Sequence, residues 1–131
     1  MTLNYKLRAW NKVKNEMEQS AYGELLIQQS GSVCIQQDDN TLADVSHDYD
    51  VMQFTGLLDK NGKEIYSCDI VKHHNTILVV EWIDDYACFS FTDKEVDTQH
   101  YLQKIDSPNL EIIGNIYETP HLLTTDNTTK V

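Results

Sequence analysis

The sequence predicts a mainly β protein whose strands form a small antiparallel barrel or sandwich with little helix. Most apolar runs are short, and β-branched and aromatic residues dominate them. Polar turn formers separate these runs, with turn signals recurring at intervals of about eight to twelve residues. The separators are too short to hold crossover helices, which disfavours alternating βαβ units.

Composition narrows the class of protein further. The 131 residues have the length of a single domain, and no apolar run is long enough to span a bilayer. The N-terminus resembles no secretion signal, so we expect a cytoplasmic location in the host cell. The three cysteines, Cys34, Cys68 and Cys88, are an odd number without C-x-x-C spacing, and we expect buried free thiols rather than disulfides or zinc ligands.

Charge indicates the kind of partner. Ten Lys and Arg against 21 Asp and Glu give a formal net charge of -11. Such a field repels phosphate backbones, so direct binding to nucleic acid is not expected. A basic protein is the more natural partner.

The first half is expected to begin with a strand. Residues 5–10 alternate apolar with charged side chains, which is typical of a strand with one wet face. Residues 11–18 are interpreted as a loop, although one or two helical turns or a hairpin loop are both possible. Residues 24–29 and 32–37 flank Ser30-Gly31 and predict a hairpin. Residues 38–50 hold five acids and no Lys or Arg, and are interpreted as a solvated loop.

The second half shows the clearer strand pattern. Extended segments are predicted at residues 51–55, 64–66, 69–71, 76–82, 86–91 and 109–117. The polar separators between neighbouring runs are short, so a meander is the expected topology. Within these runs five aromatic residues are expected in the core: Trp10 in the first half, and Trp82, Tyr86, Phe89 and Phe91 in the second.

The polar segment Asp59–Glu64 is interpreted as a turn. Aligned on Gly62, a calcium loop would need carboxylates at positions that Leu57 and Cys68 occupy. A phosphate loop would lead into a helix, whereas strand-like residues follow here. Asn61-Gly62 is the pair preferred where two successive residues take positive φ.

Two groups of polar residues deserve a test as sites. His73-His74 suggests a metal pair, but neighbours on an extended chain point to opposite faces, so no metal site is expected. His47, Asp48 and Asp50 are the one candidate acid/base group, against the alternative of ordinary surface residues in a solvated loop.

Four segments carry a resemblance to a known family. They are "KLRAW" at Lys6–Trp10, "VMQFTGLLDKNGKEIY" at Val51–Tyr66, "DIV" at Asp69–Val71 and "EIIGNIYETP" at Glu111–Pro120. In order and spacing they resemble the YopX family of phage and prophage proteins. The resemblance covers nearly the whole chain.

The resemblance implies an SH3-like barrel within residues 51–123, preceded by variable strands and an acidic loop in residues 1–50. Together these form one YopX-like domain over residues 1–123, and residues 124–131 are expected to be a disordered tail. The family brings no established activity, cofactor, metal or catalytic residue. Its shared residues form turns and bends: Gly56, Asn61, Gly62, Asp69, Gly114 and Asn115.

Cys68 departs from this pattern, because the family usually has glycine there. Glycine serves where φ is positive, since a Cβ crowds the backbone in that region. We expect instead that Ser67-Cys68 relaxes into ordinary extended backbone.

These observations favour a non-catalytic interaction module that binds a protein partner through an acidic surface. An acidic mimic of nucleic acid, aimed at a host DNA-binding protein, is the alternative. A hydrolase using the acids near His47 is a third class. Self-association is also compatible with a β-rich chain that has edge strands.

Overall fold

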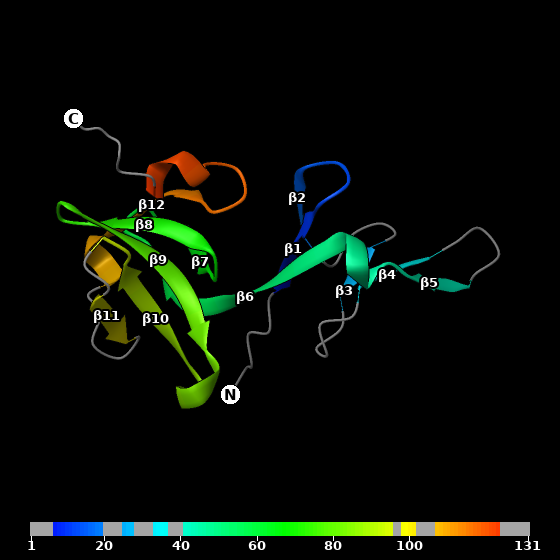
Figure 1. Cartoon of the computed structure of the whole chain (residues 1–131), viewed down its shortest axis with the longest axis horizontal. Coiled ribbons are helices and arrows are strands. Elements are labelled where there is room, and N and C mark those ends of the chain that lie inside the picture. The colour runs from blue at the N-terminus through cyan, green and yellow to red at the C-terminus, as the bar shows by residue number, and fades with distance from the viewer. Residues whose placement is uncertain are drawn as a thin grey trace. The chain divides into compact units, whose positions relative to one another are not determined.

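In a computed structural model of the protein, residues 7–19, 25–27, 33–36, 41–95, 98–101 and 107–123 are described. The chain forms two compact units, Met1–Phe54 and Thr55–Val131 (Figure 1). The predicted turn at Ser30-Gly31 and the predicted tail at residues 124–131 lie outside the described residues. No helix in the described part is long and apolar enough to cross a membrane.

The first unit begins with a hairpin where the sequence predicted a strand and a loop. β1 (Leu7–Asn11) pairs antiparallel with β2 (Glu16–Gln19), so the loop assigned to residues 11–18 is confirmed for the turn at residues 12–15, as the hairpin loop that the sequence left possible, and was wrong for residues 16–18. The side chain of Asn11 closes the turn, because its Oδ1 accepts the N–H groups of Val13 and Lys14 at 3.0 Å each. Asn15 takes the left-handed conformation with φ 56°.

The wet face predicted for β1 was also wrong. β6 (Tyr49–Leu58) covers its other edge in antiparallel register, and β1 is buried from Arg8 to Asn11. The buried Arg8 donates from Nε to the sulfur of Met52 at 3.5 Å. Side chains on both faces of β1 are thus shielded from solvent, so alternation with charged residues does not mark a solvent face here.

A second small sheet follows in the same unit. β3 (Leu25–Ile27), β4 (Val33–Gln36) and β5 (Leu42–Asp44) pair antiparallel in that order, which confirms the hairpin predicted from residues 24–37. The loop predicted for residues 38–50 was wrong in its second part, because β5, the 3-10 turn η1 (Ser46–Asp48) and the start of β6 occupy it. Ala9, Val33 and Tyr49 form the buried apolar cluster of the unit.

The second unit is a five-stranded antiparallel sheet in the order β11-β10-β9-β8-β12. β8 (Asp69–His73), β9 (Thr76–Ile83), β10 (Cys88–Asp93) and β11 (Thr98–Tyr101) follow one another as neighbours, as the predicted meander requires. β7 (Glu64–Tyr66) lies beside β6 in a separate sheet. In Figure 1 the strands β8 to β10 run side by side and are strongly curled.

β12 (Leu110–Asn115) returns to the free edge of β8. Its register shifts between Ile112 and Gly114, so a β-bulge lies at the bend that the sequence suggested at Gly114-Asn115. The 3-10 turns η4 (Ser107–Asn109) and η5 (Pro120–Leu123) flank it. The core contains Ile65, Val71, Leu78, Val80, Phe89, Phe91 and Leu110.

The mainly β fold class is confirmed. The described helices are short 3-10 turns, and the sheets curl into a half-barrel. Strand pairing among the described residues ends at β11 and β12, which are the edges of the five-stranded sheet. The SH3-like detail implied by the family stays a prediction.

The relaxed conformation expected for Cys68 was wrong. Cys68 has φ 72°, in the left-handed region. Both of its backbone groups are fixed: its N–H donates to the carbonyl of Val80 at 2.7 Å, and its carbonyl accepts the N–H of Ile116 at 3.0 Å. Because β9 and the end of β12 hold this residue from both sides, the turn cannot open into extended backbone.

Cys68→Gly is therefore expected to stabilise the protein. Removing Cβ relieves the left-handed strain, which outweighs the added entropy of the unfolded chain by about 1 kcal/mol. The melting temperature should rise by about 4 °C in a thermal scan. Cys68→Ala is the matched control, since it removes the sulfur but keeps Cβ, and should give no such gain. A lower melting temperature for Cys68→Gly would contradict the strain.

Candidate functional site

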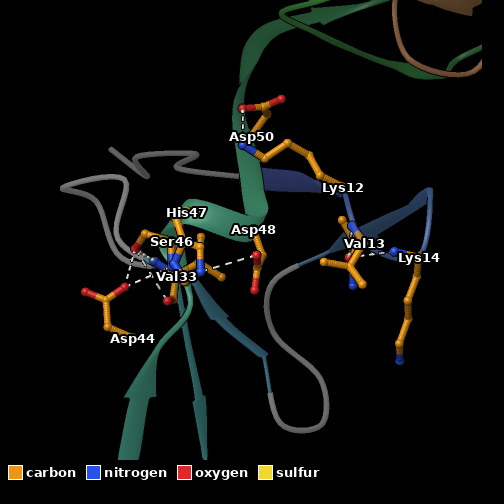
Figure 2. A network of polar contacts seen from close by, with 10 residues as sticks. Lys12, Val13, Lys14, Val33, Asp44, Ser46, His47, Asp48 and Asp50 are labelled. Carbon is orange, nitrogen blue, oxygen red and sulfur yellow. Dashed lines mark hydrogen bonds and ion pairs between the residues drawn. The ribbon is translucent and has the colours of Figure 1, made fainter.

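The acid/base group proposed at His47, Asp48 and Asp50 lies at the corner between β5 and β6. Figure 2 shows His47 directed toward Asp48, whereas Asp50 lies apart beside Lys12. His47 Nε2 is 3.4 Å from Asp48 Oδ1, and the imidazole is 82% exposed. Asp50 instead faces Lys12, with Oδ1 3.7 Å from Nζ. The structure therefore brings His47 and Asp48 together but assigns Asp50 to a different contact.

Ser46 is the hydroxyl nearest in sequence to His47, but its hydrogen bonds are directed elsewhere. Its Oγ donates to Asp44 Oδ1 at 2.6 Å and accepts the N–H of Val33 at 2.8 Å (Figure 2). Hydrogen bonds from the Ser46 hydroxyl and N–H lower the pKa of Asp44. Val45 N–H also bonds the Val33 carbonyl at 2.8 Å. This network joins β4 to the β5–β6 corner, and it gives Ser46 no imidazole base.

The segment Asp59–Glu64 is a turn organised by one buried carboxylate. Asp59 is 5% exposed, and its Oδ1 accepts the N–H groups of Asn61 at 2.8 Å and Lys63 at 2.9 Å. Its Oδ2 accepts the N–H of Ile112 on β12 at 3.0 Å. Burial alone would raise the pKa of Asp59, but these three bonds and the charge of Lys63 outweigh it and lower the pKa.

One detail predicted for this turn was wrong. Gly62 has φ 81°, but Asn61 is not among the residues with positive φ. The carboxylate of Asp59 explains the difference, because it binds the N–H on each side of Gly62 and sets a turn with one left-handed residue. Gly56, inside β6, has φ 91°.

Two other sequence-predicted turn sites have structural partners as well. Asp69 is buried, and its Oδ2 accepts the N–H of Tyr66 at 2.8 Å across the β7–β8 turn. Asn115 is buried after the bulge, where its Oδ1 accepts the N–H groups of Tyr117 at 3.0 Å and Glu118 at 2.8 Å. Its Nδ2 donates to Glu118 Oε1 at 2.7 Å. These polar side chains complete the backbone of tight turns.

The prediction that His73 and His74 point to opposite faces was wrong. Their ring centroids lie 4.4 Å apart in an edge-on contact, because His74 takes φ 57° at the β8–β9 turn and leaves the extended pattern. The described residues contain no cluster of three or more His, Cys, Asp or Glu with the geometry of a metal site.

The aromatic core prediction holds for three of the five residues. Trp10, Phe89 and Phe91 are buried, whereas Trp82 is 45% exposed and Tyr86 is 67% exposed. Trp82 does lie opposite Phe89 in the β9–β10 register, with ring centroids 5.0 Å apart. The Trp82 ring is therefore not part of the buried core cluster.

Trp82 and Tyr86 belong to a surface that sequence reasoning missed. We name the segment Trp82–Ala87 the acidic aromatic corner. It comprises the end of β9, the 3-10 turn η2 (Asp84–Tyr86) and the left-handed Ala87 with φ 49°. Figure 1 shows this turn projecting from one end of the sheet of the second unit. Asp84, Asp85 and Tyr86 are all exposed.

The corner is held in a defined conformation. Trp82 Nε1 donates to Asp84 Oδ1 at 2.7 Å, and Phe89 supports one edge of the indole. The Ala87 N–H closes the turn on the Asp84 carbonyl at 3.2 Å. The indole thus presents its surface beside the carboxylate of Asp84, and the exposed Asp85 follows in the same turn. Such a surface suits a cation that is flat and strongly charged, above all the guanidinium of arginine.

Comparison with known proteins identifies the family. The sequence profile described as YopX protein matches residues 6–124. No curated protein matches the chain in sequence.

Solved structures show the same fold. The crystal structure of protein YopX from Bacillus subtilis is similar at 19% identity with a TM-score of 0.62, covering 92% of this chain and 99% of that one. A protein of Enterococcus faecalis is similar at 23% identity with a TM-score of 0.60, covering 93% of this chain and 99% of that one.

Proposed function

The chain belongs to the YopX family, and on that premise we propose that it is a non-catalytic interaction module that binds a basic protein partner through the acidic aromatic corner. The proposal includes a phage or prophage origin and action in the host cytoplasm. The observation that carries it is the exposed indole of Trp82, which is hydrogen-bonded to Asp84 in a turn that also carries the exposed Asp85.

The physical support comes from how interfaces gain affinity. Trp, Tyr and Arg dominate the residues that contribute most to binding, and rigid aromatic side chains lose little entropy when a partner docks. An arginine of the partner would stack on Trp82 or Tyr86 while Asp84 and Asp85 balance its charge. The net charge of -11 would also speed the approach of a basic partner at low salt.

The test is a titration of isotope-labelled protein with a synthetic arginine-rich peptide, followed by NMR. Peptide addition should shift the indole N–H signal of Trp82 and the amide signals of residues 82–87. Trp82→Ala and Asp85→Asn should each weaken binding about tenfold. Binding should fall steeply when salt is raised to about 0.5 M, because the charges are exposed.

Two variants separate this corner from the general charge of the protein. Leu58→Ala removes another exposed apolar side chain, and Glu95→Gln removes another exposed acid. Both should bind the peptide like the wild type. If Glu95→Gln weakens binding as much as Asp85→Asn does, the corner is not a specific site and the proposal fails.

The acidic nucleic-acid mimic receives no specific support from the described residues. Asp59 and Asp69 are buried and bind backbone N–H groups, so neither imitates a phosphate. A hydrolase at His47 is likewise not favoured, because Ser46 binds Asp44 and Asp50 faces Lys12.

A further inference from the structure

A hollow of about 230 Å³ in the second unit gathers positive side chains on this acidic protein. Five residues from separate parts of the fold line it: Lys60, Lys72, His74, Asn109 and Glu111. Lys60 comes from the β6–β7 turn, Lys72 from β8, and His74 from the turn after β8. This site is distinct in residues from the acidic aromatic corner.

The backbone fixes the positions of the two lysines. Lys60 N–H donates to the carbonyl of Leu110 at 2.8 Å, so the start of the Asp59 turn is tied to β12. Lys72 lies directly opposite Glu111 in the β8–β12 register. Both ammonium groups are therefore carried by paired backbone rather than by an open loop.

The charge in the hollow is unbalanced. Glu111 Oε1 is 3.5 Å from Lys60 Nζ, with Glu111 41% and Lys60 49% exposed in their side chains. The hollow is thus lined by one carboxylate and two lysine side chains, which leaves a net positive charge among its lining residues. Asn109 adds an amide that can donate a hydrogen bond.

The adjoining imidazoles supply further polar groups at this end of β8. His74 contacts His73 ring to ring, with centroids 4.4 Å apart. The Nε2 atom of His73 is buried and has no hydrogen-bond partner among the described residues. Buried polar atoms are ordinarily hydrogen-bonded, but His73 is not among the residues that line the hollow, so its Nε2 atom is not counted as part of the site.

We propose that this hollow is an anion site that holds the phosphoryl group of a small phosphorylated molecule. Two ammonium groups, an imidazole and an amide match the several acceptor oxygens of a phosphate monoester. The phosphoryl group replaces Glu111 as the counter-ion of Lys60 and gains Lys72 as a second cation. A long polyanion is excluded as the ligand, because the net charge of -11 repels each additional phosphate.

The test is an NMR titration of the full chain with inorganic phosphate and with phenyl phosphate, against sodium chloride at equal ionic strength. Both phosphates should shift the signals of Lys60, Lys72, His74 and Asn109 in a saturable manner, and chloride should not. A short oligonucleotide with a 5′-phosphate should bind more weakly than phenyl phosphate. Tighter binding of the oligonucleotide would contradict the proposal that the ligand is a small phosphorylated molecule.

Variants of the lysines and of Glu111 should change the affinity for phosphate in opposite directions. Lys72→Gln and Lys60→Gln should each weaken phosphate binding about tenfold, since each removes a charge-assisted bond. Glu111→Gln should strengthen binding by about threefold or more, because it removes the competing carboxylate. Lys94→Gln is the control, as Lys94 lies elsewhere and pairs with Glu81 at 2.7 Å. If Lys60 and Glu111 form only an ordinary surface ion pair, phosphate should cause no saturable NMR shifts. That result would refute the anion site.

Discussion

Replacing Asp59 with Asn is expected to lower the free energy of unfolding by about 3 kcal/mol, because a buried acceptor of three backbone N–H groups loses half its capacity. The Asn side chain has one oxygen and one NH2 group. Whichever way it is oriented, the NH2 group faces a backbone N–H, either that of Ile112 or those of Asn61 and Lys63. Urea unfolding measures the loss of free energy. At low urea the variant should still have the fold of the wild type.

A matched variant isolates the effect of burial. Asp93 also accepts a backbone N–H, that of Glu95 at 3.0 Å, but this bond lies at the surface. Asp93→Asn should therefore cost less than about 1 kcal/mol. Equal losses for the two variants would show that Asp59 is not the residue that organises its turn.

Acid should reproduce the loss at Asp59. Its pKa is lowered in the folded state, so its contribution is fully present above the unfolded pKa of about 4 and is lost as pH falls through the folded pKa. The stability difference between wild type and Asp59→Asn should accordingly shrink below about pH 4. A difference that stays constant down to pH 2 would contradict the ionised state of Asp59.

Gly114→Ala is expected to cost about 3 kcal/mol through a steric conflict at the bulge of β12. A Cβ at this position would overlap Thr119 Oγ1 and would lie 3.0 Å from Leu122 Cδ1. Thr119 cannot turn away without loss, because its Oγ1 accepts the Asn115 N–H at 3.0 Å and donates to the Asn115 carbonyl at 3.1 Å. The measurement is again the free energy of unfolding.

A double-mutant cycle identifies the cause. Thr119→Ala removes the hydroxyl that the new methyl group would strike, so Gly114→Ala should cost clearly less in that background. Gly62→Ala is the control, because its added Cβ meets no atom within 4 Å and its cost arises from φ 81°. The cost of Gly62→Ala should not depend on residue 119. Additive losses for Gly114→Ala and Thr119→Ala would exclude the proposed conflict.

The strands that the sequence predicted well are those whose residues suit burial on a sheet. The run from Thr76 to Trp82 combines β-branched side chains with short polar flanks, and β9 spans Thr76–Ile83. β2 was missed because Glu16–Gln19 has little apolar pattern. Polar side chains hold it in place instead, through the 2.9 Å bond from Asn11 Nδ2 to Glu18 within the hairpin and the 3.2 Å bond from the distant Tyr49 hydroxyl to Glu18.

The candidate sites were harder to predict for a geometric reason. The alternation of side chains along β9 correctly puts Trp82 on the same face as Leu78 and Val80. It does not show where along the strand the core ends, so the exposure of Trp82 was missed. The hollow around Lys72 and Glu111 forms only when β12, late in the chain, pairs with β8. No local sequence motif could therefore predict it. At Cys68 the family resemblance was the better guide. The glycine usual in the family indicated a left-handed backbone, whereas the local residues Ser67-Cys68 suggested an extended one.

The bond between Asp59 and Ile112 has a consequence for the order of events during folding. It joins residues 53 positions apart, and the bond from Lys60 to Leu110 spans nearly the same distance. Until β12 has been synthesised, one oxygen of the Asp59 carboxylate and the N–H of Lys60 must remain hydrated, and the edge of β8 stays uncovered. The second unit therefore cannot complete its cooperative structure on the ribosome before Ile112 has emerged, and chains ending before that residue leave a sheet edge open to other chains.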